Sequence, residues 1–282
     1  AMTLRSTALR RDDAPGADVL VDARVCDCCP TAAARTSRGA IVAYRDRSDA
    51  EVRDISIARL VDGSWQPGGS VHPDGWEING CPVNGPALAA MGDRVAVAWF
   101  TAARNEARVS VAFSADGGAT FGERVRVDGG GALGRVDVEL LPDGSAVVLW
   151  IALGQGKAEL LARRIFADGR RGPSAVVARV GSDRSSGHAR VIRSGNQLYF
   201  AWREPAPSSR VVAAVAGVPE DAMRQAPVMM PPSIVSEVPV VQPDSSDARN
   251  SAARAMSSGV PRRFIRVFCA TSDTALAGSG NA

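Results

Sequence analysis

The strongest constraint on the fold is a motif that recurs about every 50 residues. Four short segments of small and β-branched residues each end in an aromatic residue: AIVAY at Tyr44, VAVAW at Trp99, AVVLW at Trp150 and LYFAW at Trp202. The aromatic residues follow one another at intervals of 55, 51 and 52 residues. A regular interval of this length indicates repeated structural units, each of which packs on its neighbours.

Each unit contains other strand-like segments beside the one that ends in the aromatic residue. A segment with alternating polar and apolar residues follows it, at 54–60, 108–114, 159–165 and 210–216. A shorter segment precedes it, within TAAAR, PALAA, VDVELL and ARVIR. Four strands in about 50 residues, with no helical periodicity between them, predict an all-β chain folded as a β-propeller with about four four-stranded blades. The four aromatic residues are then expected on the second strand of each blade, packed between blades.

Charge and hydropathy exclude several kinds of partner. The 33 Lys and Arg residues nearly balance the 30 Asp and Glu residues and are scattered along the chain, so no nucleic-acid footprint is expected. No apolar run approaches the ~20 residues that a membrane-spanning helix needs. The start of the sequence also has no apolar segment of the kind found in a secretory signal.

The repeat covers only part of the chain. We expect an N-terminal extension at 1–17, the propeller at 18–221 and an irregular tail rich in Pro, Ser and Ala at 222–282, where 262–271 could add a strand. The segment DVLVD at 18–22 has the register of a fourth strand without a blade of its own. Either it closes the ring by completing the last blade, or preceding blades are lacking. Unpaired sheet edges would favour homo-oligomerisation.

One turn has a recognisable motif. The string Ser114-Ala-Asp-Gly-Gly-Ala-Thr-Phe121 lies between the third and fourth strands of one blade and matches the Asp-box, or BNR, motif of sialidase-type propellers. Its glycines allow positive φ, and its Ser and Asp side chains can bond turn amides. The residues with this structural role are Ser114, Asp116, Gly118, Thr120 and Phe121.

Together with the strings at 25–55 and 72–89, this motif makes residues 18–216 resemble bacterial sialidase-like proteins, often labelled exo-α-sialidase. The resemblance implies a six-bladed relative, arginines for a substrate carboxylate, a Tyr nucleophile supported by Glu, and an Asp acid/base. The only tyrosines, Tyr44 and Tyr199, stand among apolar residues of second strands, which does not suit a nucleophile.

Counting back 15 residues from each aromatic residue aligns Cys29, Asn84, Arg135 and Gly187, which should share one rim of the central channel. Arg45 and Arg203 directly follow an aromatic residue, at the same repeat position. Arginine clusters bind carboxylates bidentately, so a carboxylate clamp is predicted. The candidate ligand-binding residues are Arg45, Arg135, Arg203, Asn84, Asp137, Trp76 and Glu77, and the candidate acids are Asp46 and Asp49. Alternatively, the arginines form ordinary surface ion pairs with nearby carboxylates.

Four cysteines precede the first strands of two adjacent blades and should meet at the same rim: Cys26, Cys28, Cys29 and Cys81. They could form disulfides, above all between the first three and Cys81. They could instead bind copper(I) or zinc, since Cys26 and Cys29 have C-x-x-C spacing and His72 or His188 could add a ligand. Reactive free thiols are the third alternative. Cys269 stands alone in the tail.

These observations favour an extracytoplasmic module that binds a glycan or another acidic ligand at the rim, since disulfides persist in oxidising compartments. An exo-α-sialidase, a glycoside hydrolase, is the alternative enzyme. A cysteine-based metal-binding or redox protein is the second alternative.

Overall fold

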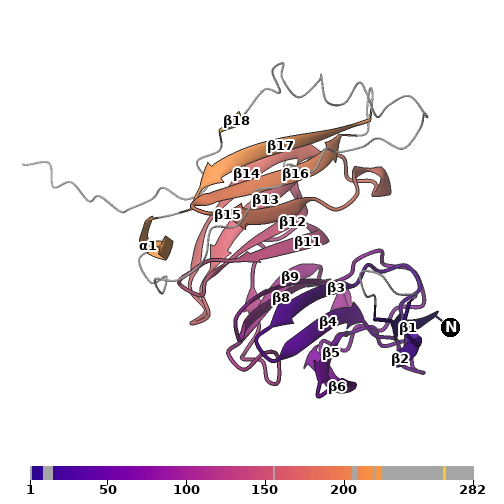
Figure 1. Ribbon diagram of the computed structural model, residues 1–282. Helices are drawn as coiled ribbons and strands as arrows, with labels where there is room; N and C mark the ends of the chain where they lie inside the picture. The colour runs from indigo at the N-terminus through magenta and orange to yellow at the C-terminus, as the bar shows by residue number, and fades with distance from the viewer. Residues whose placement is uncertain are drawn as a thin grey trace, which may run out of the picture.

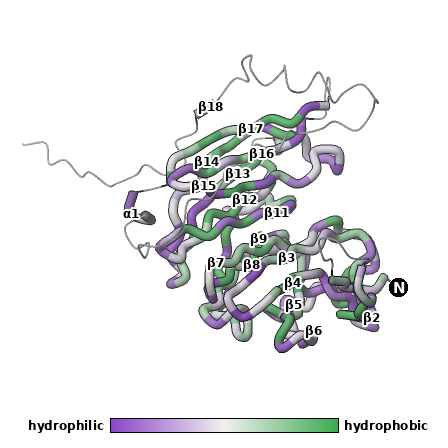
Figure 2. Tube along the Cα trace, viewed as in Figure 1, coloured by the Kyte–Doolittle hydropathy of each residue, from purple (hydrophilic) through white to green (hydrophobic). Residues whose placement is uncertain are grey.

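The computed structural model describes residues 2–8, 15–154, 156–204, 209–218, 220–223 and 263–264. These residues form four successive four-stranded sheets and one two-stranded sheet at the N-terminus (Figure 1). The all-β propeller architecture predicted from the repeat is therefore confirmed, with four blades in the described part of the chain. Apolar residues run along the strands and polar residues gather in the connections between them (Figure 2).

The first three repeat units each supply one blade, and the fourth unit supplies three strands to which residues 263–264 add the outer one; the strands of each blade are paired in chain order. The first blade holds β3 (Ala32–Thr36), β4 (Gly39–Arg45), β5 (Ile55–Val61) and β6 (Ser64–His72). The second holds β7 (Ala87–Met91), β8 (Arg94–Thr101), β9 (Arg108–Ser114) and β10 (Val125–Arg126). The third holds β11 (Ala132–Leu140), β12 (Ala146–Gly154), β13 (Lys157–Ile165) and β14 (Arg171–Val180). The fourth holds β15 (Arg190–Ser194), β16 (Gln197–Glu204), β17 (Arg210–Gly217) and β18 (Arg263–Phe264).

The blades meet through their first strands: β3 contacts β7, β7 contacts β11, and β11 contacts β15. The aromatic residues of the repeat fill the spaces between sheets. Trp99 packs in the core shared by the first and second blades, Trp150 between the second and third, and Trp202 between the third and fourth. All three are almost fully buried, as the repeat predicts. Their large rings bridge sheets whose facing residues are mostly Ala, Val and Ile.

Among the residues that the structure describes, no blade precedes that of Tyr44, the aromatic residue of the first blade. A two-stranded sheet of β1 (Met2–Ser6) and β2 (Val19–Val25) takes that place, since Val25 and Tyr44 share a core cluster with Val21 and Leu4 against it. The segment at 18–22 thus lies largely in β2, where it pairs with β1 and does not complete the last blade. Instead, β18 pairs in parallel with β17 as the outer strand of the fourth blade. The remainder of the strand expected at 262–271 lies outside the described residues.

The turn at Ser114–Phe121 has the internal bonding expected from its motif. The Ser114 hydroxyl accepts from the Gly118 amide at 2.9 Å, and the Asp116 carboxylate accepts from the Thr120 amide at 3.0 Å and the Thr120 hydroxyl at 2.7 Å. The Thr120 amide and hydroxyl and the Ser114 hydroxyl lower the pKa of Asp116. Gly118 has φ +81°, and a Cβ there would lie 2.3 Å from Ile41 of the first blade. The turn therefore helps to hold two blades together.

The short helical segments are η1 (Ala103–Asn105), η2 (Arg184–Ser186) and α1 (Glu220–Met223). In the described part of the chain, no helix has both the length and the apolar character needed to span a membrane.

Candidate functional site

Three of the residues aligned by the repeat, Cys29, Asn84 and Arg135, lie next to one another at one end of the blades, and His188, which follows the aligned Gly187, lies beside Arg135. The Asn84 backbone lies beside the Cys29 sulfur and lowers the pKa of that thiol, and the Asn84 side-chain oxygen accepts from the Arg135 amide at 2.7 Å. Arg135 in turn lies close enough to His188 for its charge to act on the imidazole. The rim predicted from the sequence therefore exists, and it joins all four blades.

Close backbone packing fixes this rim. A Cβ at residue 85 would lie 1.9 Å from the Pro30 carbonyl oxygen, and a Cβ at residue 134 would lie 2.3 Å from the Asn84 side-chain oxygen, so both positions require glycine. Asn84 also donates to the Leu133 carbonyl at 3.2 Å. Arg135 itself has φ +54°, a left-handed conformation that is uncommon outside glycine. The Asn84 contacts hold it in that conformation.

The Arg135 guanidinium is buried, with only 9% of the residue exposed. Its Nη2 donates to the Ser182 carbonyl at 3.2 Å, but its Nη1 has no hydrogen-bond partner among the described residues. Two further buried atoms of the following segment, Ser186 Oγ and His188 Nε2, are without a partner there as well. Burial lowers the pKa of both Arg135 and His188, and the positive charges of Arg190 and Arg135 lower that of His188 further. We call Arg135, Ser186 and His188 the Arg135 site.

Arg203, in the fourth blade, contacts the segment 182–186, which also contacts Arg135. Its guanidinium is exposed and donates to the Ser185 carbonyl at 2.8 Å and to the Ser209 hydroxyl at 3.0 Å. Arg184 of this segment extends to the loop of the second blade, where it donates to the Cys81 carbonyl at 3.3 Å. Two of the three arginines of the predicted clamp thus meet the 182–186 segment.

Arg45, the third arginine of the predicted clamp, lies inside the protein with 2% of its surface exposed. Its guanidinium donates to three carbonyls: Asn84 at 2.6 Å, Arg53 at 2.5 Å and Phe100 at 2.7 Å. It also stacks over the Trp76 ring, 4.9 Å from the centroid. Burial lowers its pKa. Arg45 therefore ties the first and second blades together, and it is not open to a ligand carboxylate.

Trp76 and Glu77 were expected on the open rim, but in the structure Trp76 is buried and only Glu77 is exposed. Trp76 is 7% exposed and packs edge-on against Phe100 at 5.6 Å between ring centroids, because the Asp54 carboxylate holds its amide and Arg45 covers its ring. Glu77 is exposed and forms an isolated bridge with Val52. Trp76 is thus part of the packing around Arg45, where no sugar ring could stack on it.

The candidate acids and the tyrosines lie apart from the Arg135 site. Asp46 accepts from the Ser56 hydroxyl at 3.0 Å, and burial raises its pKa. The Asp49 side chain is almost fully exposed and pairs with Arg24 at 2.5 Å. The Tyr44 hydroxyl donates to Asp22 at 2.8 Å, and the Tyr199 hydroxyl donates to Gln197 at 2.6 Å. Both tyrosine hydroxyls of the sequence are therefore engaged elsewhere.

Asp137, on the inner strand β11, joins the third blade to the fourth. Its carboxylate accepts from the Val191 amide at 2.7 Å and from Arg190 at 3.3 Å. Burial raises the pKa of Asp137, although the hydrogen bonds from Val191 and Arg190 oppose this shift. Its hydrogen bonds go to β15, so it positions the strand that follows His188.

Glu139, two residues further along β11, gives a prediction about pH. Burial raises its pKa to about 7, while the charge of Arg193 opposes the shift and that of Asp137 adds to it. Between pH about 4.5 and 7, folded Glu139 keeps a proton that the unfolded chain loses, so stability should fall as pH rises through this window. Glu139→Gln should remove this loss and raise the free energy of unfolding at pH 8 by about 1 to 3 kcal/mol. Urea unfolding of the parent protein and the variant at pH 5 and pH 8 measures the change in the free energy of unfolding with pH. If this change is the same in both proteins, the prediction is wrong.

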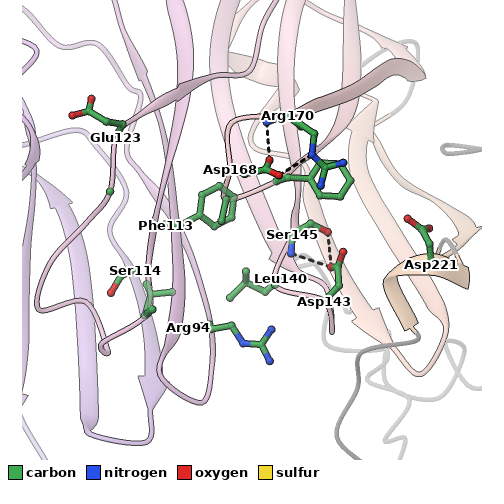
Figure 3. Close-up of a pocket in the computed structure, with 16 residues that line it drawn as sticks. Arg94, Phe113, Ser114, Glu123, Leu140, Asp143, Ser145, Asp168, Arg170 and Asp221 are labelled. Carbon is green, nitrogen blue, oxygen red and sulfur yellow. Dashed lines mark hydrogen bonds and ion pairs between the residues drawn. The ribbon is translucent and has the colours of Figure 1, made fainter.

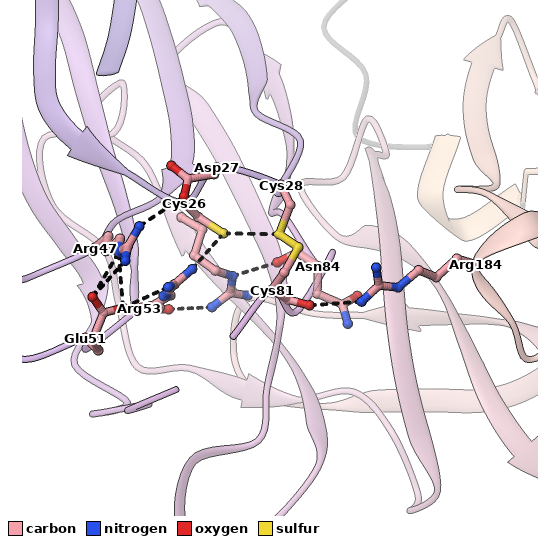
Figure 4. The surroundings of a disulfide bond; sticks show 10 residues. Cys26, Asp27, Cys28, Arg47, Glu51, Arg53, Cys81, Asn84 and Arg184 are labelled. Atoms are coloured by element: carbon pink, nitrogen blue, oxygen red, sulfur yellow. Dashed lines mark hydrogen bonds and ion pairs between the residues drawn. A yellow bond between two sulfur atoms is a disulfide. The ribbon is translucent and has the colours of Figure 1, made fainter. Parts of the chain in front are cut away.

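The four cysteines converge at the rim, as predicted. Cys28 and Cys81 form a disulfide with 6.0 Å between their Cα atoms (Figure 4), and Cys26 and Cys29 remain as thiols. Arg53 donates to the Cys26 sulfur at 3.5 Å. The hydrogen bond from the Cys29 thiol lowers the pKa of Cys26 to about 5, aided by Arg53 and opposed by burial. The same bond and burial raise the pKa of Cys29. Cys269 lies outside the described residues.

A cavity that sequence reasoning missed lies at the other end of the blades, beside the turn at Ser114. It has a volume of about 690 Å³ between the second and third blades (Figure 3). Most of its charged side chains pair with each other or with a neighbouring arginine: Arg170 with Asp168 at 2.7 Å, and Asp143 and Asp221 with Arg164 at 2.6 and 2.8 Å. Sequence reasoning gave Ser114 only a structural role in its turn, and the other lining residues come mostly from strands and turns of two separate repeats.

No family model and no curated protein matches this chain. Among solved structures, a protein of unknown function from Dyadobacter fermentans is 14% identical over 79% of this chain and 70% of its own, with a TM-score of 0.48. A thermostable family-43 glycoside hydrolase is 13% identical over 67% of this chain and 68% of its own, with a TM-score of 0.43. A xylan β-1,4-xylosidase from Bacillus halodurans is 10% identical over 68% and 40%, with a TM-score of 0.45. Likenesses this distant carry no argument about function.

The choice of site therefore depends on this chain's own geometry. The charged groups of the large cavity mostly satisfy one another, whereas the Arg135 site holds a buried cation and two buried polar atoms without partners among the described residues. Buried polar groups are nearly always hydrogen-bonded in native proteins, so unsatisfied ones indicate a place where a ligand, ion or water binds. The Arg135 site is the better candidate.

Proposed function

We propose that this propeller is a binding module for a small acidic ligand, held at the rim by the Arg135 site. The observation that carries the proposal is the buried Arg135 guanidinium, whose Nη1 lacks a partner among the described residues. A buried N–H group of a guanidinium without an acceptor is destabilising, and a carboxylate is a group that a guanidinium binds well. A ligand carboxylate at Nη1 would supply the missing acceptor.

A glycan that carries a carboxylate is the first candidate ligand. The unpartnered Ser186 hydroxyl and His188 Nε2 are suited to hydrogen bonds with sugar hydroxyls, and the exposed Arg203 lies on the same segment. The resemblance of the Ser114–Phe121 motif to sialidase-type propellers favours a sialic acid within this class. Binding alone requires no nucleophile, which agrees with the engagement of both tyrosine hydroxyls away from the site.

We also propose an extracytoplasmic location. The Cys28–Cys81 disulfide joins segments 53 residues apart, and disulfides of this kind persist in oxidising compartments. A periplasmic or secreted protein would meet carboxylated glycans at cell surfaces.

Calorimetric titration of the full chain with sialyllactose and with lactose tests the proposal. Sialyllactose should bind and lactose, which lacks the carboxylate, should not. Arg135→Met should weaken the binding of sialyllactose by about 10- to 100-fold, since a hydrogen bond to a charged group contributes roughly 1.5–3 kcal/mol.

Arg170→Met is the matched control, because Arg170 is an exposed arginine at the opposite end and should leave binding unchanged. Equal affinity for the two sugars, or equal effects of the two variants, would refute the proposal. Hydrolysis of a fluorogenic sialoside above the buffer rate, lost in Arg135→Met, would show a sialidase in place of a binding module.

A further inference from the structure

The cysteine cluster has a geometry that the acidic-ligand proposal does not use. The sulfur atoms of Cys26, Cys28 and Cys29 all lie within 4.8 Å of one another. Cys26 Sγ is 3.9 Å from Cys28 Sγ (Figure 4). All three belong to the connection between β2 and β3, at the start of the first blade. With Cys28 bound to Cys81, the cluster presents two thiols, Cys26 and Cys29, beside a disulfide.

These separations are those of sulfur atoms that share one metal ion. At a metal–sulfur distance of about 2.3 Å, two thiolates on the same ion lie roughly 3.8 Å apart in a tetrahedral arrangement and about 4.6 Å apart when opposite each other. Cys26 and Cys29 are within 4.8 Å of each other before any ion enters. Only a small movement of either side chain is needed to bring both sulfurs to one ion.

The donor set favours a metal that accepts few, soft ligands. Among the described His, Cys, Asp and Glu residues, the group that could hold an ion here consists of cysteines alone. The two histidines lie elsewhere, His72 beside Asp74 and His188 beside Arg135. Zinc in structural sites takes four ligands, whereas thiolates select Cu(I), and only two thiolates are available while the disulfide is intact.

Positive side chains favour two thiolates at this place. Arg53 donates to Cys26 and is paired with Glu51 at 2.8 Å, and the buried Arg45 lies near the cysteine pair. Nearby guanidinium groups stabilise the deprotonated sulfurs that a Cu(I) ion needs as ligands.

We propose that Cys26 and Cys29 bind one Cu(I) ion through their two thiolates, on a loop held in place by the Cys28–Cys81 disulfide. Any proton still on either thiol passes to solvent when the ion binds, and no electron is transferred. Arg53 orients the Cys26 sulfur through their hydrogen bond at 3.5 Å. The site adjoins the Arg135 site through Asn84 but is independent of an acidic ligand.

Anaerobic titration of the full chain with Cu(I) against a coloured Cu(I) chelator tests this site. All variants are made in a Cys269→Ser background, which removes the remaining cysteine of the sequence. We expect one Cu(I) per chain and a thiolate-to-copper absorption band in the ultraviolet. Cys26→Ser and Cys29→Ser should each weaken binding by about 100-fold or more, because loss of an outer-shell partner alone costs about 10- to 100-fold.

The control is the double variant Cys28→Ala/Cys81→Ala, which removes two sulfur atoms but keeps Cys26 and Cys29. It should still bind one Cu(I) under native conditions, as checked by circular dichroism. Unchanged affinity in both serine variants, loss of binding in a folded disulfide variant, or binding of Zn(II) in preference to Cu(I) would overturn the proposal. A thiol titration that finds no free thiol in the purified protein would overturn it as well.

Discussion

Replacing Arg45 with methionine should lower the free energy of unfolding by about 3 to 5 kcal/mol, since breaking a buried charged network costs this much. The guanidinium is the common donor to the carbonyls of Asn84, Arg53 and Phe100. Methionine keeps much of the side-chain volume against Trp76 but leaves three buried acceptors without a donor. Urea unfolding at neutral pH gives the difference directly.

Arg203→Met is the matched control, because Arg203 occupies the same repeat position but is exposed and bonds only to the Ser185 carbonyl and the Ser209 hydroxyl. Its effect on stability should remain within about 0.5 kcal/mol. Arg45→Lys should recover little, since one ammonium cannot reach three carbonyls in different directions as a guanidinium does. Similar losses for Arg45→Met and Arg203→Met would show that burial of Arg45 is not what stabilises the junction between blades.

The comparison of these two arginines shows what the repeat could predict. Counting along the repeat placed Arg45 and Arg203 at equivalent positions and aligned the residues of one rim, because the spacing of strands within a blade is nearly constant. It could not show which arginine is buried. Burial depends on the next blade: the loop at Asn84 and the strand at Phe100 cover Arg45, and no described blade follows Arg203.

The fold itself was more predictable than its ends. The four blade aromatics and the strands around them follow from local alternation, which is a property of the sequence alone. The pairing of β2 with β1 depends on contacts between distant segments, and the sequence of β1, MTLRS, has no pattern that predicts this pairing. The burial of Trp76 was missed for the same reason, since it depends on Arg45 and Phe100 from other strands. The meeting of four cysteines was predictable because two adjacent repeats place them before equivalent strands.

Removing the Cys28–Cys81 disulfide should have an effect as large as the loss of Arg45. The bond closes a loop across a separation of 53 residues, and restricting the unfolded chain by such a loop contributes about 4 kcal/mol in the entropic description. The double variant Cys28→Ala/Cys81→Ala should therefore unfold roughly 10 °C below the parent protein in a thermal scan without reductant.

Loss of the disulfide should also make the rim more mobile, because the disulfide anchors the loop that contains Cys81 and Asn84. In this loop the Cys81 carbonyl accepts from Arg184, and the Asn84 side-chain oxygen accepts from the Arg135 amide. In the double variant, amide hydrogen exchange should accelerate more around Asn84 and Arg135 than at β12 and β13, the middle strands of the third blade. Cys29→Ala, which removes a neighbouring thiol without breaking a crosslink, should cost about 1 kcal/mol and accelerate this exchange much less than the double variant does. If the double variant and Cys29→Ala unfold at the same temperature, the crosslink does not stabilise the rim, and the Asn84 contacts must hold it unaided.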